Sequence, residues 1–370
     1  MSVHTTLRLL AADLHYPPEL TLHTALSGAI DHLAGLFLVI ERGESFRGVG
    51  EVRANISYLT HLPAGQVAPA IRALCLGLPW SLPPAELLQA VPRLAGPAPN
   101  IARAAVTNAL VEGLARAGGQ PVAAWLGGAW QAAVPTNQCL FWGPDARFDA
   151  LAERYVGEGF RDLKVRVGVG DFAHDLARLS RLRGRYGQSI RIAIDANGAW
   201  DADRARASLA KLAPLGLSYV EQPTRPGDWV AFRAVLSDAP LPLMLDESLV
   251  TPDDLQRLAD CGPGSLAHLK LVKLGGPMAV IEAARALERA GVGLMVGQMN
   301  EGALATALAA HCVMALRPAH AELYGCYGLV DDVTGGLRYQ GGAVSVAEAA
   351  GLGVTLDETR CAVVWEEVVR

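Results

Sequence analysis

The sequence predicts an α/β fold in which a parallel barrel of alternating strands and helices is joined to a smaller α+β domain. Three short apolar runs of four to six residues indicate the barrel, in the stretches SIRIAIDAN, LSYVEQP and LPLMLDES. Their β-branched and aromatic members and their Gly or Pro boundaries are typical of buried parallel strands. The runs end in Asp195, Glu221 and Asp246, at intervals of 26 and 25 residues, which is the length of one repeating βα unit. The chain of 370 residues leaves about 100 residues beyond a TIM-type barrel of about 250.

The composition argues against partners that are large and strongly charged. Hydrophobic residues make up 51% of the chain, charged residues 19%, and the formal net charge is −5. This balance lacks the basic surface that binds nucleic acid or an anionic membrane. The chain has no uninterrupted run of eighteen apolar residues, and its six cysteines have no paired spacing, which favours reduced thiols. We therefore expect a cytoplasmic protein that acts on a small organic molecule, with no nucleic acid and no membrane partner. A homo-oligomeric state is a further expectation.

Residues 1–128 are expected to form the α+β domain, which caps the barrel. The stretches TTLRLLAADLHY, GLFLVIERG and GVGEVR are typical of strands, and LLQAVPRLAG and IARAAVTNALVEGLARAGG have helical spacing of apolar residues. Two polar loops, between Leu20 and Ile30 and between Arg53 and Ala64, are either ordinary surface connections or a lid over the barrel mouth.

Residues 129–326 are expected to form the barrel. We place strands one and two at VPTNQCLFWG and RDLKVRVG, strands three to five at the three runs above, and strands six to eight at HLKLVKLGG, VGLMVGQMN and AHAELYG. The intervening helices carry their own signals, since DADRARASLAKLAPLG has an acidic first turn and a terminal glycine. Residues 327–370 contain the strand-like pieces GGLRYQGG and AGLGVTLDE, which we expect to return to the capping domain.

The three carboxylates predict a cation site. The carboxyl ends of parallel strands meet at one mouth of a barrel, so Asp195, Glu221 and Asp246 should lie side by side. Neighbouring anions are costly unless a cation neutralises them, and a ligand set made only of oxygen favours Mg²⁺. The alternative is three unrelated acidic strand ends that face solvent.

Cationic side chains are expected on both sides of this site. Lys164 and Arg166 are two residues apart on strand two and so share a face, and Lys270 follows Asp246 by 24 residues on strand six. Strands two and six lie opposite each other across the mouth. A substrate carboxylate held on the cation would have cationic groups on both faces of its α-carbon, and a lysine whose pKa the cation lowers would be the base. Lys273, at odd spacing from Lys270, is expected to point outward.

The stretches LKVRVG, IDANGAW, VEQP, LDES, LKLVKLGG, GQMNEGALATALAAH and ELYG together resemble the enolase superfamily. Within it they resemble the mandelate racemase/muconate lactonizing enzyme family and its muconate cycloisomerase-like subgroup, over nearly the whole chain. The resemblance implies Mg²⁺, with Mn²⁺ as an alternative ion, on Asp195, Glu221 and Asp246, and Lys270 as the main acid/base. Sites of this type use a lysine or histidine base beside a magnesium ion.

One position departs from the subgroup, which normally has a second lysine on strand two where this chain has Arg166. A guanidinium stays protonated in proteins, so Arg166 is a poor base but a good partner for a carboxylate or an enediolate oxygen. A single base at Lys270, with Lys164 and Arg166 as electrostatic groups, suits an isomerase or lyase that performs cycloisomerisation or β-elimination such as dehydration. The alternatives are a racemase or epimerase of an amino-acid derivative or dipeptide, and a protein that binds magnesium and a carboxylate without turnover.

Several polar and aromatic residues are candidates for contact with the substrate or the ligand shell. His268 shares the inward face of strand six with Lys270, either as a second proton relay or as a hydrogen-bonded support for a metal ligand. Trp142 ends strand one, where it lines the pocket or packs in the core. The residues expected to bind the small carboxylate substrate are Asn197, Arg53, His23, Trp142, Gln298, Asn300 and Glu301.

Overall fold

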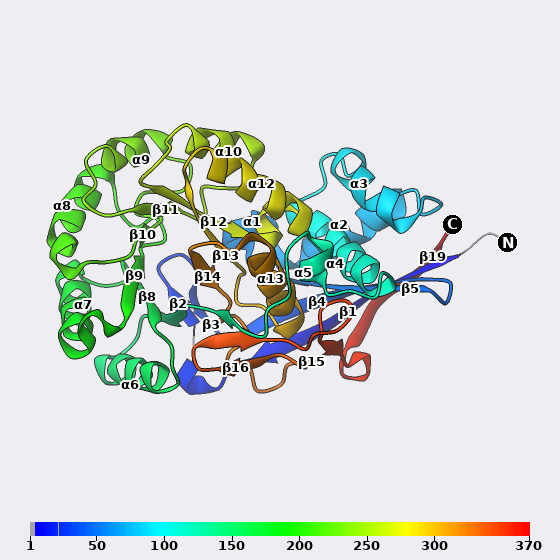
Figure 1. The fold of residues 1–370 in the computed structure, drawn as a ribbon, viewed down its shortest axis with the longest axis horizontal. Helices are drawn as coiled ribbons and strands as arrows, with labels where there is room; N and C mark the ends of the chain where they lie inside the picture. Colours follow the sequence, from blue (N-terminus) through cyan, green and yellow to red (C-terminus); the bar gives the residue numbers. More distant parts are fainter. Residues whose placement is uncertain (1–3, 21) are drawn as a thin grey trace.

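A barrel and a smaller sheet form the two main parts of the computed structural model, which describes residues 4–20 and 22–370. Figure 1 shows the barrel strands ringed by helices on one side, and on the other the small sheet with helices packed against it. The C-terminal strand lies beside the first strand of the chain, so the beginning and the end of the described chain meet in this small sheet.

The barrel sheet contains eight strands in the order β14-β13-β12-β11-β10-β9-β8-β7, and each neighbouring pair is parallel. The strands are β7 (Gln138–Leu140), β8 (Asp162–Arg166), β9 (Arg191–Asp195), β10 (Val220–Glu221), β11 (Leu243–Leu245), β12 (Ser265–Lys270), β13 (Gly293–Gly297) and β14 (His320–Glu322). Seven of them lie within the stretches that the sequence predicted, and β12 begins three residues before its stretch HLKLVKLGG and ends inside it at Lys270. The expected barrel is confirmed. One buried layer of the interior consists of Ala193, Tyr219, Met244, Leu266 and Met295.

Helices connect successive barrel strands and surround the sheet (Figure 1). Their starts use the expected capping chemistry, because the side chain of Asp201 accepts a hydrogen bond from Arg204 N at 2.8 Å before α8. No helix in the described ranges is long and apolar enough to cross a membrane. The connecting helices are α6 (Asp145–Gly157), α7 (Phe172–Tyr186), α8 (Ala202–Leu212), α9 (Trp229–Leu236), α10 (Pro252–Ala259), α11 (Leu271–Leu274), α12 (Pro277–Arg289) and α13 (Ala303–Leu316).

Strands β14 and β7 stand at the two ends of the sheet order, and a seam between them closes the barrel. Backbone N–H groups next to the two strands donate hydrogen bonds across it. Asn137 N donates to Ala321 O at 3.0 Å, and Leu323 N donates to the Thr136 hydroxyl at 2.8 Å. After β14 the chain has neither helix nor strand from residue 323 to residue 333. This irregular segment follows the seam directly.

The small sheet is antiparallel, in the order β19 (Ala362–Val369), β1 (Thr5–His15), β4 (His32–Arg42) and β5 (Phe46–Arg53). Helices α2 (Ala64–Gly77), α3 (Pro84–Leu94) and α4 (Asn100–Ala117) belong to the same part of the chain, and α4 packs across β5. This packing needs glycine at position 50, because an added Cβ would lie 2.6 Å from the carbonyl oxygen of Ala105.

Short elements join the two parts. β2 (Leu22–Thr24) pairs with β3 (Gly28–Ile30), and α1 (Ser57–Thr60) lies in the second predicted loop. The piece GGLRYQGG forms β16 (Arg338–Gln340), which pairs with β17 (Ala343–Ser345), and β17 pairs with β6 (Val134–Pro135) just ahead of the barrel. The piece AGLGVTLDE supplies Gly351, which bridges to Pro121, and β18 (Thr355–Leu356), which pairs with β15 (Thr334–Gly335). The strand that joins the opening sheet is β19, beyond both pieces.

Candidate active site

Three carboxylates lie at the carboxyl ends of adjacent barrel strands. Asp195 is the last residue of β9, Glu221 is the last residue of β10, and Asp246 follows β11 directly. Glu221 and Asp195 are register partners, which puts their side chains at the same height in the sheet. All three side chains are buried. Buried carboxylates on neighbouring strands need positive charge beside them.

The first source of positive charge is β8. The ammonium of Lys164 lies 2.9 Å from Glu221 Oε2 and 3.8 Å from Asp195 Oδ2, and it also pairs with Glu322. Arg166 Nη1 pairs with Asp195, so both cations of this strand face the interior as the two-residue spacing predicts. Burial alone would lower the pKa of Lys164, but Glu221 and Glu322 together raise it well above the ordinary value.

The second source is the end of β12. Lys270 Nζ pairs with Asp246 and lies 3.5 Å from Met299 Sδ. Burial alone would lower the pKa of Lys270, but the Asp246 carboxylate raises it above the ordinary value. The lowered pKa that we expected for a base beside a cation is thus not seen here, because in this structure Lys270 contacts a carboxylate.

Lys273 corrects a prediction. We expected it to point outward, yet it is 2% exposed, and its ammonium lies 2.6 Å from Asp246 Oδ1 and 2.9 Å from His268 O. The reason is that β12 ends at Lys270 and a helical turn, α11, begins at Leu271. The alternation of faces holds only while a strand continues, and in a helical turn the side chain three residues on returns to the same side.

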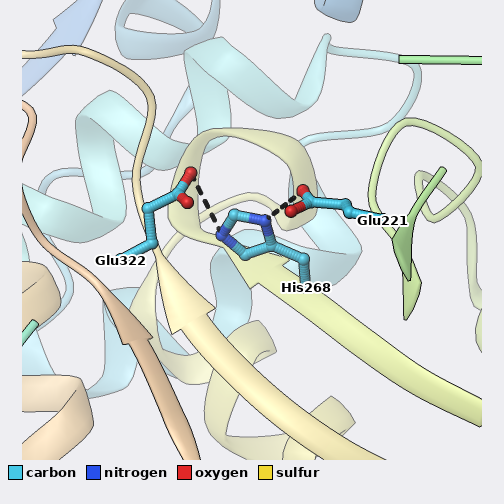
Figure 2. A group of neighbouring side chains, drawn as sticks. All are labelled: Glu221, His268 and Glu322. Carbon is cyan, nitrogen blue, oxygen red and sulfur yellow. Dashed lines mark hydrogen bonds and ion pairs between the residues drawn. The ribbon is translucent and has the colours of Figure 1, made fainter. Parts of the chain in front are cut away.

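His268 lies between two glutamates, as Figure 2 shows. Its Nδ1 is 2.8 Å from Glu221 Oε1, and its Nε2 is 3.9 Å from Glu322 Oε1. Among the described residues, Glu221, His268 and Glu322 are the group whose ligand atoms all lie within 4.8 Å of one another. Burial lowers the pKa of His268, which favours a neutral ring. Sequence reasoning gave Glu322 no role, although it ends the eighth strand just as Asp195 and Glu221 end theirs.

The donor set fits a hard divalent cation. The buried cations at this mouth are Lys164, Arg166, Lys270, Lys273 and Arg53. The buried carboxyl groups, which outnumber them, are Asp195, Glu221, Asp246, Glu247, Glu301 and Glu322. Burial alone would raise the pKa of Asp246, but Lys270 and Lys273 hold it well below the ordinary value, and Glu221 is likewise lowered by Lys164 and His268. Oxygen donors that stay ionised suit Mg²⁺. The group with His268 includes an imidazole, which suits transition metals instead.

A cavity opens above the carboxylates and reaches the two loops that we expected as surface connections or as a lid. From the first loop it is lined by Leu22, Thr24, Ser27 and Ile30, and from the second loop region by Arg53, Tyr58 and Leu59. On the barrel side its polar lining consists of Arg166, Asn197, Asp246, Glu247, Lys270 and Asn300. Both loops therefore cover the mouth of the barrel, as expected for a lid rather than for ordinary surface connections.

Three of the expected substrate-binding residues line this cavity. Arg53 is 1% exposed and is held by Asn55 Oδ1 at 2.6 Å and by Asn300 O at 3.2 Å. Asn197 has a positive φ of 44° and its side-chain amide donates to Glu247 Oε1 at 2.8 Å.

Glu247 is a cavity residue that sequence reasoning missed. It follows Asp246 directly, but β11 has already ended at Leu245, so the alternation of faces along a strand does not turn its side chain away from the site.

The other four expected residues do not line the cavity. The ring of His23 lies against that of Trp142, with centroids 5.0 Å apart. The amide of Gln298 donates to Thr306 Oγ1 at 2.7 Å, on α13. Glu301 accepts a hydrogen bond from Met299 N at 3.1 Å, and burial raises its pKa from 4.5 to about 7. These residues lie around the mouth, where β7, β13 and the loops end.

Comparisons with known proteins point to the family of the chain. The family model described as "Enolase C-terminal domain-like" matches residues 147–360. Muconate cycloisomerase 1 of Pseudomonas putida is 28% identical over 359 residues, which cover 94% of this chain and 93% of that protein. L-Ala-D/L-Glu epimerase of Bacillus subtilis (strain 168) is 33% identical over 257 residues, which cover 68% of this chain and 70% of that protein.

Solved structures agree in the whole architecture. The muconate lactonizing enzyme from Pseudomonas fluorescens, solved in complex with muconolactone, is similar with a TM-score of 0.89 at 25% identity, over 97% of this chain and 98% of that chain. The L-Ala-D/L-Glu epimerase from Bacillus subtilis is similar with a TM-score of 0.85 at 27% identity, over 94% and 97% of the two chains. With its capped barrel and its carboxylates on successive strands, the chain belongs to the mandelate racemase/muconate lactonizing enzyme family of the enolase superfamily.

Proposed function

We propose that the protein is a Mg²⁺-dependent isomerase or lyase that removes the proton α to a substrate carboxylate, and that it performs cycloisomerisation or β-elimination. The observation that supports this choice is the lining of the cavity. It contains Lys270 from one side of the mouth and Arg166 from the other, whereas Lys164 lies deeper and is fully buried. One side thus presents a group that can exchange a proton, and the other presents a guanidinium that stays charged.

The metal ligands in this proposal are Asp195, Glu221 and Asp246. Bound Mg²⁺ would neutralise negative charge that develops on the substrate carboxylate. His268 would act as a positioning residue, because its hydrogen bond to Glu221 fixes the orientation of that carboxylate. Manganese is a second candidate ion for the same oxygen donors.

The chain's own residues would then divide the work. Lys270 takes the α-proton, which leaves an enediolate, and Arg166 donates hydrogen bonds to its oxygen atoms from the opposite side. In β-elimination the enediolate then expels the β-substituent with its electron pair. In cycloisomerisation ring closure forms the enediolate, and Lys270 delivers a proton to its α-carbon. Arg53 and Asn197 line the cavity and would orient a small carboxylate substrate there. Lys164 stays bound to Glu221 and Glu322 and supplies electrostatic support. The homo-oligomeric state and the cytoplasmic location stay predictions, as do the boundaries at residues 128 and 326.

A second candidate is a racemase or epimerase of an amino-acid derivative or dipeptide. It is favoured by relatives whose names describe epimerases, including the hydrophobic dipeptide epimerase of Enterococcus faecalis, which is 33% identical over 201 residues. Such a reaction needs a proton donor or acceptor on each face of the α-carbon. Lys164 would have to supply the second one, and it would have to leave two glutamates to do so.

The experiment is a screen of carboxylic acids and acylated amino acids with the Mg²⁺-loaded protein in deuterium oxide, followed by NMR. We expect stereospecific exchange at one α-hydrogen, or conversion to a product, with at least one class of acid. The variant Lys270→Ala is the matched control and should show neither. Exchange of both α-hydrogens at equal rates would overturn the one-base proposal in favour of racemisation. Binding of acids without exchange of any α-hydrogen would favour a protein that binds magnesium and a carboxylate without turnover.

A further inference from the structure

A second pocket lies at the barrel seam, beside the catalytic cavity. It is enclosed by the end of β7, the helix α6, the loop after β14 and the first loop of the small domain. Its lining is rich in aromatic and aliphatic side chains, and Arg147 is the charged residue in it. The residues on which the argument rests are Tyr16, Phe148, Leu151, Tyr155, Tyr327 and Gln138.

The pocket adjoins the catalytic cavity. Leu22, Phe141 and Asn300 line both of them. Phe141 follows β7 directly and stands at this boundary, with its ring 6.2 Å from that of Tyr324 and 5.8 Å from the guanidinium carbon of Arg166. A substrate whose carboxylate lies near Arg166 and Lys270 would extend past Phe141 to reach the seam.

Gln138 supplies a polar group that has no partner. Its side chain is 2% exposed, and its Oε1 accepts a hydrogen bond from Cys139 N at 2.9 Å, which fixes the amide orientation. Its Nε2 is buried without a hydrogen-bond partner. Leaving a buried donor unsatisfied is costly, and such donors in native proteins call for an explanation. An oxygen acceptor on a ligand in the pocket would satisfy it.

We propose that the seam pocket binds the distal part of the substrate, and that this part is an apolar or aromatic group with one uncharged oxygen acceptor that reaches Gln138. This inference rests on the proposed function, because it extends the carboxylate substrate of the same site. The mostly aromatic and aliphatic walls favour a phenyl ring or a branched chain. The substrate class is therefore a monocarboxylate with a carbonyl or ether oxygen several bonds from the carboxylate, followed by an apolar end.

The test measures binding with four matched acids, by calorimetry on the Mg²⁺-loaded protein. 5-Oxo-5-phenylpentanoate has both features, 5-phenylpentanoate lacks the carbonyl, 5-oxohexanoate lacks the ring, and hexanoate lacks both. We expect 5-oxo-5-phenylpentanoate to bind most tightly and hexanoate most weakly, because the ring and the acceptor each add affinity. Tighter binding of the dicarboxylate hexanedioate than of 5-oxo-5-phenylpentanoate would overturn the inference, since it would point to Arg147 as the anchor of a second carboxylate.

Two variants separate the two features. Gln138→Leu should lower the affinity ratio of 5-oxo-5-phenylpentanoate to 5-phenylpentanoate by about tenfold, the usual worth of a hydrogen bond in a dry site. Leu151→Trp fills the pocket from α6 and should lower the ratio of 5-oxo-5-phenylpentanoate to 5-oxohexanoate by about tenfold or more. Val230→Trp adds the same bulk at a position on α9 that is 83% exposed, and it serves as the control. If neither ratio changes in the variants, the pocket does not hold the substrate.

Failure of this inference and failure of the proposed function give different results. If α-hydrogen exchange occurs but the two ratios are insensitive to the variants, the catalytic proposal stands and the seam pocket is wrong. If the ratios respond as expected but none of the four acids, nor any acid of the broader screen, undergoes exchange, the pocket is a binding site and the catalytic proposal is wrong.

Discussion

The two sides of the barrel mouth carry similar charge by different local structures. On β8, Lys164 and Arg166 are two residues apart in a continuous strand, and both point inward. On the opposite side, Lys270 ends β12 and Lys273 lies in the helical turn α11, and both contact Asp246. The first pair spreads its charge over Asp195, Glu221 and Glu322, and the second concentrates it on one carboxylate.

This difference suggests separate roles for the two sides, one in stabilising charge and the other in transferring a proton. Arg166 keeps its proton under all ordinary conditions, and Lys164 is tied to two glutamates in the interior. Lys270 reaches the cavity, while Lys273 lies behind it, bound to Asp246 and to the backbone oxygen of His268. The β8 side is therefore expected to stabilise negative charge, and the β12 side to exchange the substrate proton. The predictions below test this division, from the largest expected effect to the smallest.

Replacing Lys270 tests the division most directly. Lys270→Ala should lower the exchange rate of the α-hydrogen by roughly two to four orders of magnitude, because a general base is lost. Lys164→Ala should instead lower the unfolding temperature more, since Glu221 and Glu322 lose a buried ion pair. NMR exchange and thermal unfolding of both variants measure the two effects. Near-normal exchange in Lys270→Ala would mean that the base lies elsewhere.

Removing one ligand charge tests whether the carboxylates bind the metal. Glu221→Gln should weaken Mg²⁺ binding by about 10–100-fold or more. Replacing residues that only support metal ligands already costs about 10–100-fold in affinity, so the loss of a ligand charge should cost at least as much. Calorimetry with Mg²⁺ measures this, and Glu282→Gln, at an exposed glutamate of α12, is the control. Equal Mg²⁺ affinity in the Glu221 variant and in the unmodified protein would rule out Glu221 as a ligand.

Changing Arg166 to lysine tests the asymmetry itself. Arg166→Lys should introduce a second group that exchanges protons, and exchange at the other face of the α-carbon should appear at a low level because the surroundings fit a planar guanidinium. The measurement is the stereochemistry of deuterium incorporation. A raised KM with unchanged stereochemistry would instead mean that Arg166 only orients the substrate.

The smallest expected effect concerns Glu301, which lies near the β12 side of the mouth. Burial raises its pKa from 4.5 to about 7, so the folded protein binds a proton over a range where the unfolded chain has lost it. Its contribution to stability is therefore fully present below pH 4.5 and is lost as the pH rises through about 7. Glu301→Gln should remove that loss. The drop in unfolding temperature between pH 4.5 and pH 8 should therefore be about 2–4 °C smaller in the variant than in the unmodified protein. Thermal unfolding of both proteins across this range is the measurement, and parallel curves would contradict the assignment.

The sequence by itself determined the barrel and the position of its carboxylates. Short apolar runs with a repeat of 26 and 25 residues specify parallel strands, and the ends of such strands must meet at one mouth. Asp195, Glu221, Asp246, Lys164, Arg166 and Lys270 follow from that rule, because each lies at or near a strand end and its direction depends on local alternation.

Only the tertiary structure decided what happens where strands stop. Lys273 and Glu247 face the site because β12 and β11 end at Lys270 and Leu245, and those ends depend on hydrogen bonds to neighbouring strands. The amide of Gln298 donates to Thr306 and does not face the cavity. The unpaired Nε2 of Gln138 could be recognised as a candidate ligand contact only once the pocket around it was known. These features arise from contacts between residues far apart in the chain, which no local pattern of residues encodes.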